Sequence, residues 1–110
     1  MTDLPTADPS PTIRSFTLDW PIVVAGHEEI AAGTQIRVRK PQSGELRGLQ
    51  VASLLQMDYV SLETLAPRVT TPILHKHLVA AMDPGDLTQF AGEVTDFLLP
   101  KGVREPSPQA

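Results

Sequence analysis

The stretch Thr34-Gln-Ile-Arg-Val-Arg-Lys-Pro-Gln-Ser-Gly-Glu-Leu-Arg-Gly-Leu49 contains a change of hydrophobic period that decides the fold class. Before its proline, apolar and charged side chains alternate, with Ile36 and Val38 on one face, as in a half-buried strand. After the proline, Ser43 is a suitable N-cap and Glu45 suits a first helical turn. An apolar stripe at helical spacing follows, formed by Leu46, Leu49, Leu54 and Leu55. The stretch therefore predicts a strand followed directly by a helix.

A second alternating run precedes this stretch and predicts another strand. Its expected inward face consists of Phe16, Leu18, Trp20, Ile22 and Val24. Pro21 has no N–H to donate, so this strand lies at a sheet edge or is broken near its middle. Residues 25–33 are polar and contain two glycines, which indicates a connecting loop. Together the two runs predict a two-stranded antiparallel hairpin with a long loop.

The rest of the chain predicts short helices. Asp58 is expected to cap a second helix that Pro67 ends, and Thr71 with Pro72 is expected to open a third. Asp83 caps a last helix, whose apolar stripe is Leu87, Phe90, Ala91, Val94, Phe97 and Leu98. The predicted fold class is α+β: an N-terminal two-stranded antiparallel hairpin followed by about four short helices.

The length and composition indicate one domain between two tails. The chain has 110 residues, of which 41% are hydrophobic and only 5% aromatic, so aliphatic side chains must build a single modest core. Proline-containing polar segments at both ends predict flexible tails over residues 1–12 and 101–110. Residues 13–100 are the predicted α+β domain.

Several classes of function conflict with the composition. The net charge of −4 argues against a nucleic-acid-binding protein, and the absence of cysteine excludes thiolate metal sites and disulfides. No apolar run approaches the roughly 20 residues of a membrane helix. His75 and His77 lie two apart, which on a helix places them on different faces, so no metal site is expected. No nucleophile turn or phosphate-binding loop is present, so we expect a non-enzymatic protein without a cofactor.

Charge and apolar patterning leave the kind of partner open. The basic residues concentrate at Arg37, Arg39, Lys40 and Arg47. The first interpretation is the solvated outer face of an edge strand, where positive charge opposes edge-to-edge pairing. The second is a docking face for an acidic partner, or for this chain's own acids Asp83, Asp86, Glu93 and Asp96; nucleic acid ranks third. The leucine stripes favour self-association or binding of a partner helix.

The order of motifs resembles one family. After Ile36–Leu49, three more stretches follow in the order that is typical of this family: Leu54-Leu-Gln-Met-Asp58, Leu65-Ala-Pro-Arg-Val-Thr-Thr-Pro72 and Met82-Asp-Pro-Gly-Asp-Leu87. The chain from Phe16 to Leu99 is similar in this way to the E-type tail assembly chaperones of contractile-tailed phages and prophages, which include the Mu-like proteins. The most specific segment is Arg-Lys-Pro followed by Gly-Glu-Leu-Arg-Gly.

The resemblance implies a non-enzymatic protein of the bacterial host cytoplasm that is absent from the mature virion. Such chaperones bind the tape measure protein and keep it soluble while the tail tube assembles, and an extended frameshifted form binds tail tube protein. Self-association is also expected. The residues selected as candidate partner contacts are Arg39, Lys40, Glu45, Leu46 and Arg47. The alternatives are a structural tail or baseplate subunit that stays in the particle and, third, a nucleic-acid-binding regulator.

Overall fold

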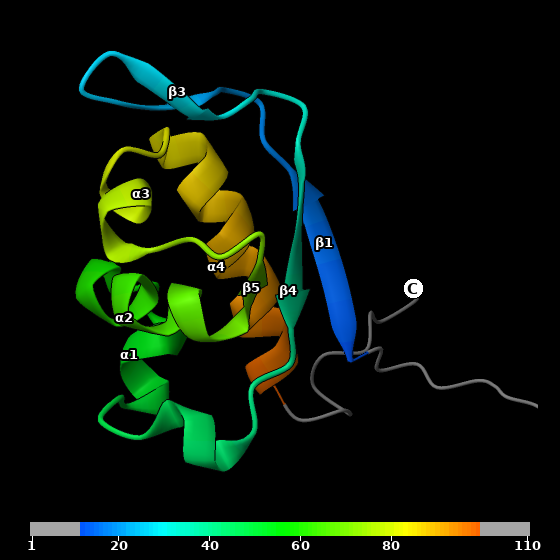
Figure 1. The fold of residues 1–110 in the computed structure, drawn as a ribbon. Helices are drawn as coiled ribbons and strands as arrows, with labels where there is room; N and C mark the ends of the chain where they lie inside the picture. Colours follow the sequence, from blue (N-terminus) through cyan, green and yellow to red (C-terminus); the bar gives the residue numbers. More distant parts are fainter. Residues whose placement is uncertain (1–11, 100–110) are drawn as a thin grey trace, which may run out of the picture.

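The computed structural model describes residues 12–99, in which two small sheets precede and flank a set of helices (Figure 1). The strands are β1 (Ile13–Thr17), β2 (Ile22–Val24), β3 (His27–Ile30), β4 (Gln35–Arg39) and β5 (Thr70–Thr71). The helices are the 3-10 helix η1 (Ser43–Leu46), α1 (Val51–Leu55), α2 (Tyr59–Val69), α3 (Lys76–Ala80) and α4 (Pro84–Leu98). The α+β class is confirmed. The predicted tails lie outside the described residues, apart from Thr12.

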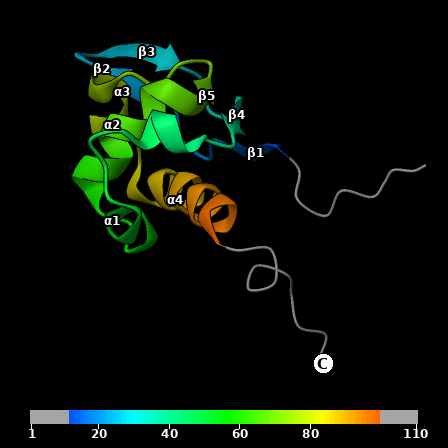
Figure 2. The same ribbon diagram turned by 90° about the horizontal axis from the view of Figure 1, so that it is seen from below.

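The larger sheet has the order β1-β4-β5 and is covered on one face only. β1 and β4 pair antiparallel, with Phe16 opposite Ile36, so the predicted pairing of these two runs is confirmed. Phe16, Ile36 and Val38 point inward and are buried. Helix α4 lies against this inner face, and the other helices lie on the same side of the sheet (Figures 1 and 2). In the described part of the chain, the outer face carries no helix.

The prediction of a two-stranded hairpin is wrong, because the first alternating run divides at Trp20-Pro21. Residues before the break form β1, and Ile22 begins β2, which belongs to a second sheet. The expected loop over residues 25–33 contains β3, which pairs antiparallel with β2. Trp20 is 59% exposed and does not join the inward face on which the alternation placed it. β5 adds a third strand to the larger sheet beside β4.

The first predicted helix is interrupted at a glycine. Gly48 has φ +82°, a left-handed conformation that only glycine adopts readily, so the helical path stops after η1 and resumes at Val51. The residue that caps η1 is Gln42, and Ser43 is its first residue. The expectations of an N-cap at Ser43 and of one continuous helix after it are therefore wrong.

Two predictions about prolines also fail. Pro67 lies inside α2, close enough to its end that the helix continues to Val69 with the loss of one backbone hydrogen bond. Thr71 is a residue of β5, so the third helix does not open there. It begins at Lys76, after a turn in which the Thr70 hydroxyl accepts from the backbone N–H of Leu74 at 2.8 Å.

The predicted caps of α2 and α4 are confirmed. Asp58 Oδ2 accepts from the backbone N–H of Ser61 at 3.0 Å, and Asp83 Oδ2 accepts from that of Gly85 at 2.9 Å. The stripe of α4 is equally clear, with Phe90, Ala91, Val94 and Phe97 buried. α4 is therefore the helix on which the larger sheet and α1 pack.

We expect the substitution Asp58→Ala to lower the free energy of unfolding by about 1 kcal/mol, the usual cost of losing an N-cap. Asp58 also accepts from the Ser61 hydroxyl at 2.9 Å, and this contact disappears with it. Urea denaturation measures the effect. Asp58→Ser retains a capping oxygen and is the matched control, with an expected loss well below that of alanine; equal losses would contradict the capping role.

Candidate functional site

An ion pair joins two of the candidate partner contacts to each other. Arg39 at the end of β4 donates from Nη1 and Nη2 to the two carboxylate oxygens of Glu45 in η1, at 2.7 and 2.6 Å. The backbone N–H of Gln42 donates to Glu45 Oε1 at 2.9 Å and completes the cap of η1. Arg39 and Glu45 therefore hold the turn between strand and helix in place.

Arg68 belongs to the same network, although it was not among the selected residues. Its Nη1 donates to the carbonyl oxygens of Glu45 and Arg47, at 2.8 and 3.0 Å. In return, Arg39 Nη2 donates to the carbonyl oxygen of Arg68 at 2.6 Å. These contacts tie β4, η1 and α2 together. The stretch Leu65–Pro72 already contained Arg68, but nothing in the sequence spacing indicated that α2 ends beside η1.

The other three candidates differ in their surroundings. Lys40 and Arg47 are exposed, and within residues 12–99 neither side chain has a hydrogen-bond or ion-pair partner. Leu46 is half-buried and packs against the core. Lys40 and Arg47 are thus available to contact a charged partner, whereas Leu46 packs η1 against the core.

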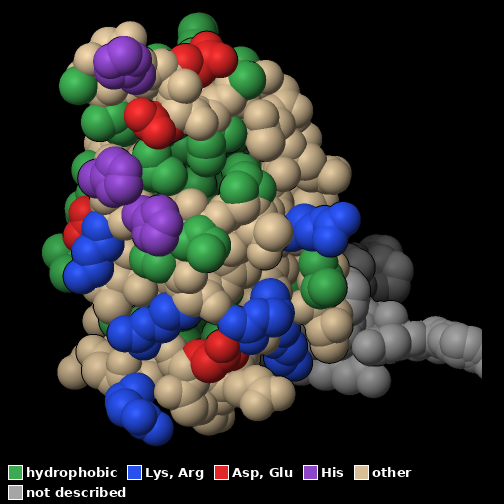
Figure 3. All heavy atoms as spheres, in the orientation of Figure 1, with side chains coloured by type: hydrophobic (Ala, Val, Ile, Leu, Met, Phe, Trp, Pro, Cys, Tyr) green, Lys and Arg blue, Asp and Glu red, His purple; other side chains and the backbone are tan. Residues whose placement is uncertain are grey.

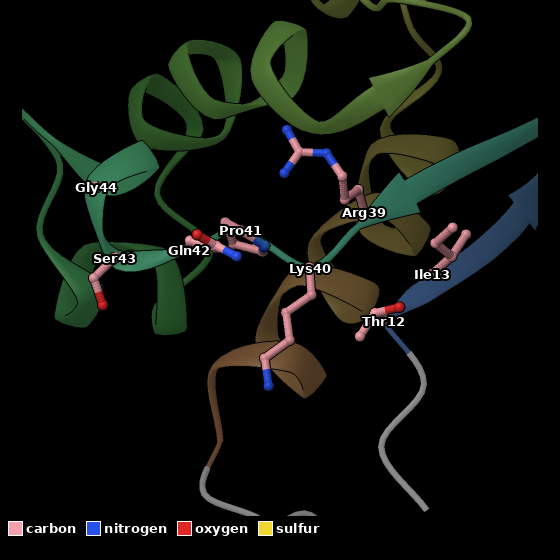
Figure 4. Close-up of a pocket in the computed structure, with 8 residues that line it drawn as sticks. All are labelled: Thr12, Ile13, Arg39, Lys40, Pro41, Gln42, Ser43 and Gly44. Carbon is pink, nitrogen blue, oxygen red and sulfur yellow. The ribbon is translucent and has the colours of Figure 1, made fainter. Parts of the chain in front are cut away.

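Three hollows lined by described residues lie beside this network, and the smallest of them, of about 320 Å³, is lined by Gly44, Glu45, Arg47 and Arg68. Of the other two, the first, of about 810 Å³, is lined by Thr12, Ile13 and the chain from Arg39 to Gly44, and Figure 4 shows the side chains of Arg39 and Lys40 pointing in opposite directions. The second, of about 330 Å³, is named here the arginine groove. It is lined by Ile13, Arg37, Arg39, Arg68 and Ile73, among others, and lies over the outer face of the sheet.

The first interpretation of the basic residues, an edge strand, is wrong. β4 lies between β1 and β5, with Arg37 opposite Thr71, so its positive charges do not protect a free edge. They stand on the uncovered outer face of a central strand. Figure 3 shows Lys and Arg side chains gathered over the half of the molecule that carries η1.

The acids of the last helix do not meet these basic residues. Arg14 from β1 donates to Glu93 and pairs with Asp96 at 2.7 Å on α4. Asp86 is 1% exposed and accepts from the backbone N–H groups of Asp19 and Trp20, at 2.9 and 3.1 Å. Arg14 was not assigned to a face from the sequence; the signal that could have found its pairing is that Arg14 lies two residues before Phe16, on the same face of the strand.

A second exposed surface is apolar. Five large side chains are exposed within ten residues of α1, the following turn and the start of α2: Val51, Leu55, Met57, Tyr59 and Val60. Val60 is 64% exposed, although it lies in a regular helix. Because exposed apolar side chains concentrated in one segment indicate a contact surface, this apolar surface is a second candidate site.

Other chemistry finds no support in the part of the chain that the structure describes. His75 and His77 do not point apart: their rings stack with centroids 6.0 Å apart, because His75 caps α3 and lies outside its helical path. No group of three or more histidine and acidic residues suitable for a metal ion occurs over residues 12–99. None of the helices in that range is long and apolar enough to cross a membrane.

The pKa of Glu45 falls to about 2, mainly because Arg39 hydrogen-bonds to its carboxylate and also because of the Gln42 N–H. A lowered pKa means that the pair is fully formed above the ordinary value of 4.5 and is lost as the pH falls through about 2. We therefore expect a ¹³C NMR titration to find Glu45 still ionised at about pH 4, and Arg39→Ala to move its midpoint back towards 4.5. A midpoint near 4.5 in the unaltered protein would refute the ion pair.

Comparison with known proteins identifies the family. The family model described as phage tail assembly chaperone proteins, E, or 41 or 14, matches residues 15–99. Tail assembly protein E of Escherichia phage P2 is 38% identical over 89 residues, which span 81% of this chain and 93% of that protein. Tail assembly protein E' of the same phage is 37% identical over 84 residues, or 76% of this chain and 56% of that protein. No solved structure matches. The chain therefore belongs to the phage tail assembly chaperone family and is non-enzymatic, as its motif order indicated.

Proposed function

We propose that this chain binds the tape measure protein of its phage or prophage and keeps it soluble while the tail tube assembles. It acts in the cytoplasm of the bacterial host and is absent from the mature virion. Membership of the tail assembly chaperone family supports an assembly role. The observation that carries the choice of partner is the apolar surface of α1 and α2, because a long protein with amphipathic helices needs such a surface to cover its apolar faces.

The candidate residues have different roles in the proposed binding. Lys40 and Arg47 contact carboxylates of the partner, since both are exposed and unpaired in the described residues. The Arg39–Glu45 pair holds η1 in the position that presents them, and Leu46 anchors η1 to the core. The exposed side chain of Val60 contributes apolar contact. Binding of this kind weakens moderately with added salt, because only its charged part is screened.

We expect co-expression to make the tape measure protein soluble and to allow the two proteins to be purified together. Val60→Asp places a charge in the apolar surface and is expected to reduce the co-purified tape measure protein at least tenfold; Arg47→Glu reduces it less, because it removes one exposed contact. Lys76→Glu makes the same charge change as Arg47→Glu, but on α3, away from η1 (Figure 1), and is the matched control. A tape measure protein that stays insoluble would refute the proposal.

A second proposed partner is the tail tube protein. We propose that an extended form of this chain, produced by a translational frameshift, binds tail tube protein; the relative E' is longer than the matched region, which covers 56% of it. Mass spectrometry of the co-purified material detects such a form by peptides that start in the sequence of this chain and then diverge from it. Its absence from infected or induced cells would remove the tube protein from the list of partners.

The alternative is a small structural subunit that remains in the tail or baseplate. The two functions differ in one measurement, the protein content of purified particles. A chaperone is absent from finished tails, whereas a structural subunit is present at a fixed number of copies per particle. Detection at fixed stoichiometry would replace the chaperone proposal with this one.

A further inference from the structure

Charge is divided unevenly between two parts of the molecule. Residues 15–36 contain three acids and no Lys or Arg, and residues 77–99 contain four acids and no Lys or Arg. Residues 37–76 contain six Lys and Arg against three acids. Figure 3 shows acidic side chains at the end of the molecule that carries the β2–β3 hairpin, while Lys and Arg lie in the half towards η1. Asp86 is buried and Glu93 and Asp96 pair with Arg14, so the acidic end of the surface consists of Asp19, Glu28, Glu29 and Asp83, opposite a basic half.

Trp20 stands at the acidic end as an exposed aromatic side chain on a fixed backbone. It is the only tryptophan of the chain and is 59% exposed. Its backbone N–H donates to the buried carboxylate of Asp86 at 3.1 Å, and Pro21 restricts the next residue. Exposed tryptophans held in this way are typical of the residues that dominate protein interfaces.

The arginine groove in the basic half offers the complementary surface. Ile13 and Ile73 are 55% and 50% exposed, so its apolar lining is open to solvent. Arg37 has no hydrogen-bond or ion-pair partner among the described residues, and it stands on the outer face of β4 beside the groove. The volume of about 330 Å³ lies at the lower end of the range for small-molecule sites and exceeds that of an aromatic side chain.

We propose that Trp20 of one copy of this chain enters the arginine groove of a second copy. The guanidinium of Arg37 then lies over the indole ring in a cation–π contact. Asp19, Glu28 and Glu29, at the same end as Trp20, face the arginines of the neighbour, which gives the contact complementary charge. The proposal does not depend on the tape measure protein being the partner.

The geometry makes this contact intermolecular and head-to-tail. Ile13 and Thr17 are the two ends of β1, about 14 Å apart at the rise of an extended strand, and Trp20 lies beyond Thr17. Trp20 therefore does not reach the Ile13 end of its own groove, and within the described residues it makes no cation–π contact with Arg37 of the same copy. Because the two contacting surfaces differ, each pair of copies leaves one free tryptophan and one free groove. The expected product is an open chain of copies that lengthens with concentration.

Two single-site variants test the proposal by removing one surface each. Trp20→Ala lacks the inserting side chain, and Arg37→Glu has a groove of opposite charge. In sedimentation velocity, the wild type is expected to show a series of oligomers. Each variant alone is expected to stay monomeric at concentrations at least tenfold above those at which the wild type associates. Circular dichroism checks that both variants fold, and Arg37→Ala provides a milder change with the same direction.

Mixing the variants gives the sharpest result. Trp20→Ala retains an intact groove and Arg37→Glu an intact tryptophan, so the mixture is expected to form a one-to-one dimer and nothing larger. The emission of the single tryptophan shifts to the blue when this dimer forms, and salt at about 0.5 M weakens it. Lys76→Glu, a charge change on α3, oligomerises like the wild type. A wild type that stays monomeric, variants that oligomerise alone, or a mixture without dimer would each overturn the proposal.

Discussion

Phe90→Ala is expected to lower the free energy of unfolding by about 3–5 kcal/mol, the range for truncating a buried phenylalanine. Phe90 is 0% exposed at the centre of α4, and its ring centroid lies 6.3 Å from that of Phe16 on β1. Its loss opens a cavity where α4 meets the sheet. Because a domain of this size is stabilised by only about 5–10 kcal/mol, the variant is expected to retain little folded protein at 37 °C.

Equilibrium denaturation in urea measures this effect, and Val60→Ala is its matched control. Val60 is 64% exposed, so its truncation removes little buried area and is expected to change stability by less than about 0.5 kcal/mol. The two variants separate apolar residues that stabilise the fold from apolar residues that are free to meet a partner. A large loss at Val60 would mean that the apolar surface belongs to the core.

Asp86→Ala has the second largest expected effect, a loss of about 2–3 kcal/mol. The carboxylate accepts from two backbone N–H groups, at Asp19 and Trp20, and from Gln89 Nε2 at 3.0 Å. Removing it leaves both N–H groups without their acceptor where the chain turns from β1 towards β2. The loss falls short of that at Phe90, because the exposed residues 19 and 20 admit water.

The effect of Asp86→Ala extends to Trp20, whose backbone it holds. We expect the fluorescence anisotropy of Trp20 to fall in the variant as the side chain becomes more mobile. Asp86→Asn retains an accepting oxygen and is expected to lose less than half as much stability. Thr88→Ala, an exposed position on the same helix, controls for the substitution of a polar residue; a loss equal to that at Asp86 would show that the buried carboxylate contributes nothing specific.

Local rules predicted those parts of the fold that depend on neighbouring residues. The caps at Asp58 and Asp83 need only an oxygen two or three residues before a helical N–H, so they were recognisable in the sequence. The stripe of α4 and the alternation of β4 reflect one buried face each. These elements, and the antiparallel pairing of β1 with β4, are confirmed.

The same rules failed where a distant residue decided the outcome. Trp20 fits the alternation of β1, but Asp86 on α4 holds the backbone there and turns it outward. Pro67 was read as the end of a helix, although α2 continues for another half turn. β5 exists because the chain after α2 passes beside β4, which no local pattern of Thr70 and Thr71 reveals.

The candidate site shows the same division. The sequence selected the segment that carries Lys40, Glu45 and Arg47, and its motif order identified the family. It did not reveal that Arg39 forms an ion pair with Glu45, or that Arg68 of α2 donates a hydrogen bond to the carbonyl oxygen of Glu45 in η1.

The sequence by itself determined the α+β class, the inward faces of β4 and α4, two helix caps and the family of the protein, because periodicity, capping and motif order involve residues close in the chain. Only the tertiary structure decided which charges are paired, which face of the sheet is open and where Trp20 points. Apart from the Arg39–Glu45 pair, whose members are close in the chain, these outcomes depend on residues far apart in the sequence, such as Arg14 with Glu93 and Trp20 with Asp86. Their proximity arises from packing, which no local pattern records.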